Sequence, residues 1–491
     1  MNHFDVVIVG AGLSGIGAAY HLQDKCPGKT FAILEGREAI GGTWDLFRYP
    51  GIRSDSDMHT LGYNFKPWID AKAIADGPSI RKYVNETADE NNIRQHIRFN
   101  RRVTSASWST KTALWTVQVE LVDSSETMEY SCNFLFMCGG YYNYDEGYTP
   151  EFKSADAFKG VVIHPQFWPE DFEYKGKRVI VIGSGATAMT LVPAMAEGGA
   201  QVTMLQRSPT YVVSRPAQDK IANVLRKFLP ESWAYAITRF KNIQLGNIFL
   251  RRALAKPEKT KDMLLKMVRK AMPDIDVDTH FTPSYNPWDQ RLCLIPDDDL
   301  YNVINKGLAK VVTNHIDCFT EKGIRLVSGE ELEADIIVTA TGLKLSVANG
   351  LKLYVDGETV NIPETVSYKG MMYSGVPNLV QTFGYINASW TLRADMIAQY
   401  SCQLLNHMDS LGLRQCTPII GERDKDMELR PWISDFTSGY MQRMMHLLPK
   451  QGEGPWENIQ NYARDKKQQF EAPLDDGAMQ FTNPVKETKA A

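Results

Sequence analysis

Apolar and polar positions alternate along the chain in blocks that predict strands and helices in turn. An apolar run at residues 5–9 has the continuous pattern of a buried parallel strand. A helical pattern follows through Leu22, and a second apolar run occupies residues 31–34. The same succession recurs downstream, where apolar runs at residues 179–182 and 202–205 flank another helical pattern. This order is typical of parallel sheets covered by helices, so we predict an α/β fold.

Two further apolar runs end in small residues. Residues 134–137 lead into Cys138-Gly139-Gly140, and residues 335–338 lead into Ala340-Thr341-Gly342. Each run fits a place where the chain crosses between domains, and each fits an ordinary strand end equally well. The chain has 491 residues, which is too many for one core of ordinary size. We therefore expect two or three coupled domains.

The turn after the first strand carries glycines in GxGxxG spacing, at Gly10, Gly12 and Gly15. Gly10 permits a tight turn, Gly12 lets the backbone approach a pyrophosphate, and Gly15 lets the helix pack closely on the strand. Ser14 belongs to the same turn, and Glu35 ends the second strand twenty residues past Gly15. An acid at that place accepts hydrogen bonds from ribose hydroxyls. A merely tight turn is the competing interpretation, but the strand, helix and acid all favour a dinucleotide site.

The second turn has a different character. Gly183, Gly185 and Ala188 give GxGxxA, with Ser184, Ala186 and Thr187 between them. The strand that follows ends in Arg207 and Ser208 rather than in an acid. A carboxylate there would repel a 2′-phosphate, whereas Arg207 can pair with one, so the pattern favours NADP(H) over NAD(H). The competing interpretation is that Arg207 is a solvated charge at a strand end.

Together the two turns predict FAD, which stays bound, and NADPH, which shuttles. We expect two Rossmann-like dinucleotide-binding domains of the glutathione-reductase type. The FAD domain is predicted at 1–142 and 343–491, and the NADP domain at 155–214 and 290–342, with a helical insertion at 215–289. The reacting site is expected in the cleft between the domains, where the two dinucleotides meet.

Composition narrows the function classes further. A formal net charge of −4 suggests neither nucleic-acid binding nor an acidic tail. The seven cysteines are scattered and form no CxxC pair, so we expect no metal site and no disulfide framework, in keeping with a reducing cytoplasm. Strand-like sequence begins almost at once, which argues against a signal peptide. The weakly polar run at 179–196 contains Gly and Pro and fits strand–turn–helix better than a membrane span.

Two longer motifs identify a family. Residues 158–169 read FKGVVIHPQFWP, with Phe158, Gly160, His164 and Trp168 in the spacing FxGxxxHxxxW. A second motif runs from Gly41 to Asp55 and includes Gly42, Trp44, Tyr49, Pro50 and Gly51. In both motifs the chain resembles the class B flavin monooxygenases, in particular the type I Baeyer–Villiger monooxygenases. Further stretches, such as 41–58 and 286–293, are similar to the mycobacterial ethionamide-activating members.

This resemblance implies a reaction. The family uses NADPH, O2 and a flavin C4a-peroxide to insert one oxygen next to a ketone carbonyl, and related members oxidise sulfides or thioamides. The implied substrate is therefore a small lipophilic ketone or sulfur compound. The alternative is the sister activity, oxidation of nitrogen and sulfur without ketone activity, against which Trp168 and Arg291 argue. A third possibility, from another class, is a non-catalytic flavoprotein that senses NADPH.

The resemblance also assigns residues. Arg291 is implied as the catalytic cation, because a guanidinium stays charged and offers directional donors to an anion, and Asp55 would orient it. The family often has Lys beside this arginine, but here the neighbour is Gln290, which leaves more of the NADPH discrimination to Arg207. Flavin contacts are expected, besides those of the first turn, from Gly42, Thr43, Trp44, Asp45, Leu46, Arg53, Ser54, Asp55 and Val103.

For His164 two roles stay open. Its place just before the second nucleotide domain favours a linker residue that fixes domain geometry, and direct chemistry is the other interpretation. Trp44 likewise fits either the flavin ring or plain packing.

The region from Lys220 to Lys270 has a composition of its own. It holds thirteen lysines and arginines, opposed only by Glu231, Glu258 and Asp262, with aromatic and aliphatic residues at helical spacing. We predict amphipathic helices inserted in the NADP domain. One interpretation is a helical lid with a solvated basic face. The other is peripheral attachment to an anionic membrane, with a lipophilic substrate arriving from that side.

Overall fold

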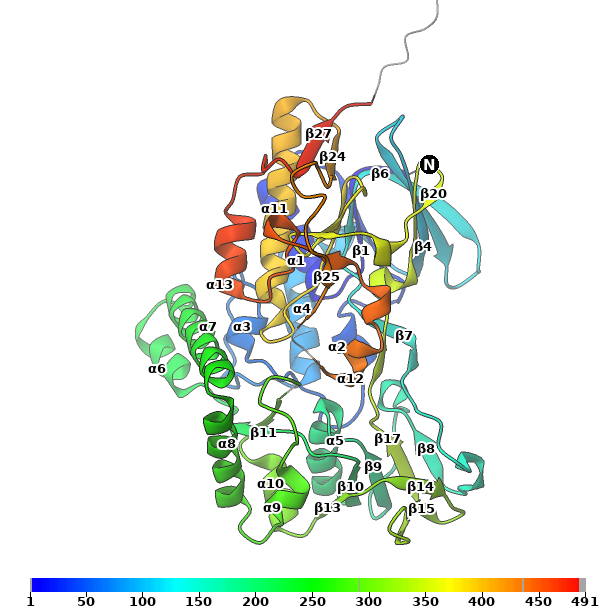
Figure 1. Ribbon diagram of the computed structural model, residues 1–491, viewed down its shortest axis with the longest axis vertical. Coiled ribbons are helices and arrows are strands. Elements are labelled where there is room, and N and C mark those ends of the chain that lie inside the picture. Colours follow the sequence, from blue (N-terminus) through cyan, green and yellow to red (C-terminus); the bar gives the residue numbers. More distant parts are fainter. Residues whose placement is uncertain (1, 291, 435–436, 485–491) are drawn as a thin grey trace, which may run out of the picture.

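The structure is a computed structural model that describes residues 2–290, 292–434 and 437–484. Figure 1 shows two sheet-containing halves, one above the other, with a group of helices along one side. Both halves combine strands with covering helices, and the predicted α/β class is confirmed. The expected strands are present, most of them a residue or more longer than the apolar runs alone indicated.

The upper half is built on a nine-stranded sheet. Its order is β20-β19-β4-β5-β6-β1-β2-β3, and β23 also pairs with β6. The central strand β1 pairs in parallel with β2 and β6, so the first glycine turn opens at the carboxyl end of a buried strand. The strands are β1 (Asn2–Val9), β2 (Phe31–Leu34), β3 (Ile97–Arg98), β4 (Arg101–Ser109), β5 (Leu114–Leu121), β6 (Thr127–Met137), β19 (Lys352–Val355), β20 (Glu358–Thr359) and β23 (Leu379–Gln381).

Helices cover one face of this sheet. The helix after the first turn, α1 (Leu13–Lys25), packs against α11 (Trp390–Leu411), although the two are far apart in sequence. Their contact brings the C-terminal part of the chain beside the first nucleotide turn. The other helices on this side are α2 (Thr43–Leu46), α3 (Met58–Leu61) and α4 (Gly77–Glu90).

The lower half contains a five-stranded parallel sheet in the order β13-β10-β9-β17-β8. It is the second strand–turn–helix unit predicted from the sequence, and α5 (Ala186–Glu197) follows its turn. The strands are β8 (Val161–Ile163), β9 (Arg178–Ile182), β10 (Gln201–Gln206), β13 (Ala309–Thr313) and β17 (Ile336–Thr339). An antiparallel meander, β14 (Ile316–Phe319), β15 (Gly323–Leu326) and β16 (Glu331–Glu333), adjoins it.

The chain passes between the halves at two neighbouring places. β7 (Tyr142–Gly147) leads down and β18 (Leu343–Leu345) leads back, and the two pair in an antiparallel ribbon. Both follow the small-residue runs after 134–137 and 335–338, so here those runs do lie where the chain crosses between the sheets.

Four helices make up the segment 215–289; the first three form the group at the side of Figure 1, and the last lies lower, beside α10 (Asp299–Asn305). The four are α6 (Lys220–Phe228), α7 (Glu231–Ala255), α8 (Pro257–Ala271) and α9 (Val277–Phe281). The segment leaves from β11 (Val212–Arg215) and returns at β12 (Cys293–Pro296), which pair in parallel. Throughout the described part of the chain, every helix is too short or too polar to cross a membrane.

Of the remaining elements, α10 packs against α5 in the lower half, and the others belong to the C-terminal part of the chain. These others are β21 (Ser367–Tyr368), β22 (Met372–Tyr373), β24 (Gln415–Pro418), β25 (Arg430–Pro431), α12 (Gly439–Gln442), β26 (Lys450–Gln451), α13 (Tyr462–Arg464) and β27 (Met479–Thr482).

A buried charged cluster ties the C-terminal segment to α11. Arg393 of α11 and Asp465 are both fully buried and lie 3.3 Å apart, from Nε to Oδ2. The hydroxyl of Tyr385 donates to the same carboxylate at 2.6 Å. Desolvation raises the pKa of Asp465 to about 6, although the Arg393 charge and the Tyr385 hydrogen bond oppose the shift.

Candidate active site

A cavity of about 1340 Å³ lies where the two halves and the helical group meet. Its wall combines the first glycine turn, the segment 41–61, the crossing ribbon, the start of α5 and the inner side of α7. The predicted residues that line it are Gly10, Gly12, Ser14, Glu35, Gly42, Thr43, Trp44, Arg53, Ser54, Asp55, Val103, His164, Ala186 and Thr187. The cavity extends from the first glycine turn to the start of α5, the helix that follows the second turn, whose own glycines are not among the described lining residues.

The first turn has no room for side chains. Gly10 has φ +100°, and a Cβ there would lie 2.9 Å from the carbonyl oxygen of Cys138. A Cβ on Gly15 would lie 1.9 Å from the carbonyl oxygen of Gly10, so Gly15 sits behind the turn and not in the cavity wall. Helix α1 begins at Leu13 beside the cavity, which directs the positive end of its dipole toward that space.

Glu35 stands at the end of β2 with its carboxylate buried. Oε2 accepts a hydrogen bond from Ala11 N at 2.7 Å, and Oε1 accepts one from Arg37 N at 2.9 Å. Burial raises the pKa of Glu35, and the two backbone N–H groups and Arg37 oppose that shift. Each carboxylate oxygen keeps lone-pair capacity toward the cavity, which suits ribose hydroxyls.

Asp45 and Leu46, expected as flavin contacts, are not among the described residues that line the cavity. Asp45 is instead buried behind the wall, where its carboxylate binds three arginines. The N–O distances are 2.6 Å to Arg37, 2.7 Å to Arg48 and 3.3 Å to Arg81. Of these arginines only Arg37 lines the cavity, so Asp45 is placed to hold Arg37 rather than to touch a ligand.

The C-terminal half supplies wall residues that sequence reasoning missed. Nε1 of Trp390, in the first turn of α11, donates to Ser14 Oγ at 2.8 Å. The Trp390 ring stacks on Tyr141 with centroids 5.0 Å apart and planes at 13°. Tyr144 also lines the cavity, next to Gly42 and Thr43. Trp390 is 376 positions from Ser14, so no local pattern connects them.

The second turn is open on one side. A Cβ on Gly183, which has φ +137°, would lie 2.3 Å from the carbonyl oxygen of Ala340, whereas one on Gly185 would meet nothing within 4 Å. Ser184 Oγ donates to the carbonyl oxygen of Ser208 at 3.1 Å, which fastens the turn to the end of β10. In the described wall this unit contributes Ala186, Thr187 and Thr190, while Arg207 and Ser208 lie exposed beyond it.

The loop that carries Asp55 is anchored in the lower half. Arg53 Nη1 lies 2.7 Å from Asp299 Oδ2 at the start of α10, and Arg53 Nη2 donates to Met189 O of α5 at 3.2 Å. Ser54 Oγ accepts from Ser56 N at 2.9 Å, which turns the chain at this point. Asp55 itself lines the cavity with its side chain exposed.

Arg291 lies outside the described residues. On its two sides Trp288 and Leu292 line the cavity. Trp288 has φ +78°, and its buried Nε1 has no hydrogen-bond partner among the described residues. Asp289 fixes the preceding turn, because Oδ2 accepts from Asn286 N at 3.0 Å and its carbonyl oxygen accepts from Thr437 N at 2.9 Å. The segment with the predicted catalytic arginine therefore adjoins the same space as Asp55.

His164 lies at the crossing ribbon. Its Nε2 is 3.1 Å from Gly342 O, and its Nδ1 accepts from Gln166 N at 3.2 Å. These partners fit the neutral ring with its proton on Nε2, and burial lowers the pKa of His164. A Cβ on Gly147 would lie 2.1 Å from Cε1 of this ring. Since the backbone engages both nitrogens, the arrangement suits a linker rather than a general base.

The other residues of the FxGxxxHxxxW motif pack within the lower half and are not among the described residues that line the cavity. Phe158 packs against Phe319 in a buried cluster. A Cβ on Gly160 would lie 2.4 Å from Asp335 O. Trp168 packs edge-on against Phe172 and Tyr174. These residues of the motif therefore pack the lower half beside the crossing ribbon.

The site fits two dinucleotides. The first glycine turn with its buried acid, Glu35, opens into the cavity, and the start of α5, just after the second turn, also lines it. The wall holds unused polar groups as well, such as the buried Oε1 of Gln166, which has no partner in the described structure. An isoalloxazine or a nicotinamide ring can form hydrogen bonds with polar groups of this kind. Gly12 and Gly185 leave room for pyrophosphates.

Two family models match the chain. Residues 70–351 match the flavin-binding monooxygenase-like family, and residues 8–71 match an NAD(P)-binding Rossmann-like domain. Together they cover both nucleotide turns and the helical group.

Relatives match over the full length. An FAD-containing monooxygenase named EthA, from Mycobacterium tuberculosis H37Rv, is 52% identical over 98% of each chain. A probable FAD-binding monooxygenase named AlmA, from Acinetobacter baylyi, is 48% identical over 98% of this chain and 96% of its own. The resemblance to mycobacterial members of the family, expected from the motifs, is confirmed.

Solved structures match the fold. An oxidised steroid monooxygenase bound to NADP is 25% identical, with a TM-score of 0.72 over 85% of this chain and 87% of its own. A structure of OTEMO in complex with FAD and NADP is 23% identical, with a TM-score of 0.71 over 86% and 87%. The second shows a common fold only.

Proposed function

The chain belongs to the flavin-binding monooxygenase-like family, and on that premise we propose that it is a Baeyer–Villiger monooxygenase. It uses FAD, NADPH and O2 to convert a lipophilic ketone into an ester or lactone, and it also oxidises sulfides or thioamides. The observation that carries the proposal is the cavity that joins the first glycine turn, Asp55, and Trp288 and Leu292 on the two sides of Arg291.

In this proposal the upper half, 1–142 and 343–491, holds FAD. All strands of the nine-stranded sheet come from these residues. The start of α1 and Gly12 receive the pyrophosphate, Glu35 accepts from the ribose, and Trp44 and Trp390 border the flavin ring. When bound, the flavin supplies the oxygen-activating and electron-transfer chemistry of the reaction.

NADPH binds the lower half, 155–214 and 290–342, with 215–289 as the helical insertion. Gly185 and the start of α5 receive its pyrophosphate, and the exposed Arg207 pairs with the 2′-phosphate. Because Gln290 is uncharged, Arg207 provides most of the discrimination against NADH. Ser184, bonded to Ser208, keeps the end of β10 beside this turn.

Arg291 is proposed as the cation that stabilises negative charge developing on the reacting oxygen atoms. Asp55 pairs with the guanidinium and keeps it oriented. The link from Arg53 to Asp299 fixes the loop that carries Asp55 against the lower half. The His164 ring fixes the crossing ribbon, which sets the angle at which the halves meet.

The apolar part of the cavity wall explains why the substrate is lipophilic. It comes from the inner side of α7 and from the strands beside the helical insertion. The residues concerned are Ile243, Leu245, Phe249, Leu250, Leu292 and Leu294. A ketone held there lies against water-excluding side chains, which limits decay of the activated oxygen to H2O2.

Product analysis tests the activity. The FAD-loaded protein is given NADPH, O2 and either 2-octanone or phenylacetone, and esters are measured by gas chromatography beside NADPH consumption. We expect ester formation coupled to NADPH oxidation. Sulfoxide formed from a simple sulfide, with no ester from any ketone tried, would contradict the proposal and favour the nitrogen- and sulfur-oxidising alternative.

Arg291→Ala tests the assignment of the catalytic cation. The variant should bind FAD as the wild type does, but ester formation should fall by about 10²–10³, because one stabilising group of this kind has that effect. NADPH oxidation should then yield H2O2. Arg325→Ala removes an exposed arginine of the β14–β16 meander and serves as the matched control. Ester formation near the wild-type rate in Arg291→Ala refutes the assignment.

A further inference from the structure

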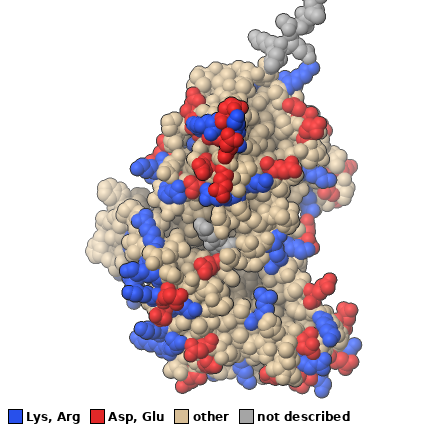
Figure 2. Space-filling view, in the orientation of Figure 1, with Lys and Arg blue, Asp and Glu red and all other residues tan. Residues whose placement is uncertain are grey.

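The outer surface of the helical insertion is apolar at its tip. On α6 the side chains of Ile221, Val224 and Phe228 share one face and are all exposed, Phe228 at 80%. On α7, Trp233 and Phe240 are each 66% exposed and lie on one side of the helix. Figure 2 shows the corresponding projection at the left edge as mostly tan, without acidic groups. Soluble surfaces rarely gather large aromatic side chains in this way.

Basic residues flank this tip. Figure 2 shows blue groups along the same edge below the projection, over the position of α8. The exposed basic side chains of the end of α7 and of α8 are Arg251, Arg252, Lys256, Lys259, Lys266, Arg269 and Lys270. Lys259, Lys266 and Lys270 line a shallow groove along α8, together with one acid, Asp262, and two methionines. The chain as a whole is negative, so positive charge is concentrated on this side.

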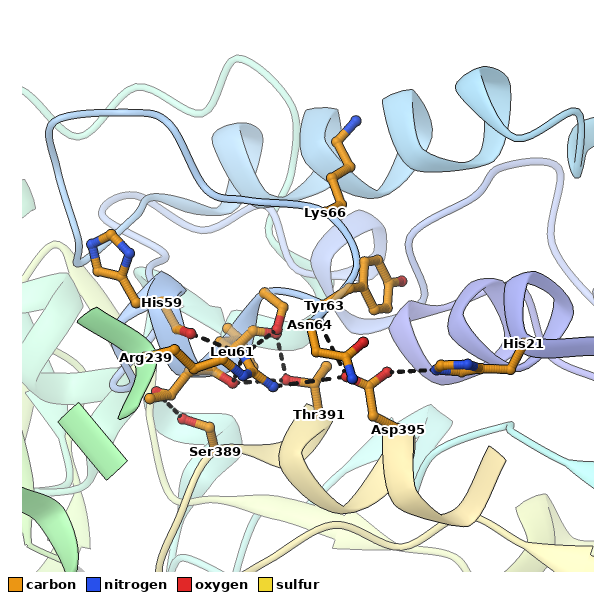
Figure 3. A network of polar contacts seen from close by, with 12 residues as sticks. His21, His59, Leu61, Tyr63, Asn64, Lys66, Arg239, Ser389, Thr391 and Asp395 are labelled. Atoms are coloured by element: carbon orange, nitrogen blue, oxygen red, sulfur yellow. Dashed lines mark hydrogen bonds and ion pairs between the residues drawn. The ribbon is translucent and has the colours of Figure 1, made fainter. Parts of the chain in front are cut away.

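The insertion is held firmly against the upper half (Figure 3). Arg239 of α7 donates to the carbonyl oxygens of His59 and Gly62, each at 2.8 Å. Its Nη2 lies 3.7 Å from Asp395 of α11, which in turn contacts His21 of α1 at 3.3 Å. These contacts hold α7 in place, so the apolar side chains on its outer side are exposed in the folded chain.

The cavity reaches this surface. Ile221 of α6 and Leu245 of α7 line the cavity wall and are also exposed, at 55% and 57%. If α6 and α7 lay against another apolar surface, an apolar molecule leaving that surface would reach the cavity at Ile221 and Leu245.

We propose that α6, α7 and α8 form a docking surface for an anionic phospholipid bilayer. The apolar side chains of α6 and α7 enter the acyl boundary, and the lysines and arginines beside them contact anionic headgroups. A second copy of the chain fits less well, because a two-fold contact would set these basic groups against one another. The docking places the cavity mouth at the bilayer and does not depend on which atom the enzyme oxidises.

Vesicle flotation of the FAD-loaded full-length protein tests the proposal. We expect binding to phosphatidylcholine vesicles that contain phosphatidylglycerol, weaker binding to phosphatidylcholine alone, and release at high salt. Lys259→Gln, Lys266→Gln and Lys270→Gln combined should lower the partition coefficient by about 100-fold, since each lysine near an anionic surface contributes about tenfold or less. The matched control is Lys153→Gln, Lys177→Gln and Lys352→Gln, three exposed lysines elsewhere.

The apolar side chains are tested separately. Trp233→Ser with Phe240→Ser should reduce vesicle binding by at least about tenfold. The pair Val327→Ser and Leu411→Ser, which changes other exposed apolar residues, should not. Flavin absorbance and light scattering monitor folding and oligomeric state. Wild-type protein that fails to float with anionic vesicles, or control variants that lose binding equally, would overturn the proposal. So would self-association that Trp233→Ser and Phe240→Ser abolish, in the absence of vesicle binding.

Discussion

At the scale of single residues, burial decides what a charged side chain can do. Asp45 and Asp465 are both buried carboxylates, but their surroundings differ. Asp45 binds three arginines and positions one of them in the cavity wall. Asp465 has one arginine, which is itself fully buried, and a tyrosine hydroxyl that donates to it. Desolvation outweighs those two partners, and its pKa rises to about 6.

This shift predicts a pH dependence of stability. The folded-state pKa lies above the unfolded value of about 3.9, so the folded chain takes up the proton first as the pH falls. The stabilisation is complete below about pH 4 and is lost as the pH rises through about 6. Relative to Asp465→Asn, which cannot titrate, the free energy of unfolding of the wild type should therefore rise by about 2–3 kcal/mol from about pH 7 to about pH 4.

Urea unfolding curves of both proteins, measured at several pH values, check this result. Asp475→Asn, an exposed carboxylate of the same segment, is the control, and its curve should stay parallel to that of the wild type. The free energy of unfolding of the wild type, taken relative to that of Asp465→Asn, should become more favourable toward acid pH. A relative value that stays constant or falls contradicts the raised pKa.

At the scale of elements, the positions of the glycine motifs differ in the space around them. Gly15 is enclosed by the backbone of its own turn, whereas Gly185 faces open space at the start of α5. The two positions therefore separate a packing role from a binding role. Gly15 is the third position of its motif and Gly185 the second position of its own, which are the positions expected to serve packing and pyrophosphate binding.

We expect Gly15→Ala and Gly185→Ala to fail in different ways. A methyl group on Gly15 would lie 1.9 Å from Gly10 O, so the first variant should lose FAD and about 1–3 kcal/mol of stability. Gly185→Ala should keep its melting temperature and flavin, while its KM for NADPH rises by about tenfold because the methyl group occupies the pyrophosphate space. Thermal unfolding, flavin absorbance and steady-state kinetics measure these effects. Equal loss of stability in both variants, or an unchanged KM for NADPH in Gly185→Ala, would be inconsistent with this distinction.

At the scale of the whole molecule, the relative position of the halves depends on a narrow ribbon. β7 and β18 are paired, and the His164 ring bonds to Gly342 O while lying against Gly147. The Arg53–Asp299 pair is a second link, and Arg53 lines the same cavity as His164. Both links lie close to the space where the two dinucleotides are proposed to meet.

Gly147→Ala should disturb this geometry. Its methyl group would lie 2.1 Å from His164 Cε1, so the ring must leave Gly342 O. We expect a lower melting temperature and more H2O2 per NADPH consumed, with FAD retained. Adding His164→Ala to Gly147→Ala removes the clash and should recover part of the melting temperature. A His164→Ala single variant that keeps its melting temperature but makes no ester would instead point to direct chemistry by this residue.

The sequence by itself determined the two nucleotide turns, their strands, the end residues Glu35 and Arg207, and the amphipathic insertion. These features depend on neighbours within about twenty positions, where apolar periodicity and the conformational freedom of glycine act directly. A reaction was inferred only from resemblance to a known family, through the motifs at Gly41–Asp55 and Phe158–Trp168.

Only the tertiary structure decided which residues share the cavity wall. It placed Trp390 on Ser14, put Asp45 behind the wall and Arg37 in it, bound both nitrogens of His164 to the backbone, and tied Arg53 to Asp299. Most of these contacts join residues whose meeting depends on how helices and sheets pack. The Asp45–Arg37 pair and the bond from Gln166 N to His164 are local in sequence, but the burial of Asp45 is not determined locally. Local patterns determine the elements, whereas burial and long-range packing determine which side chains of those elements meet.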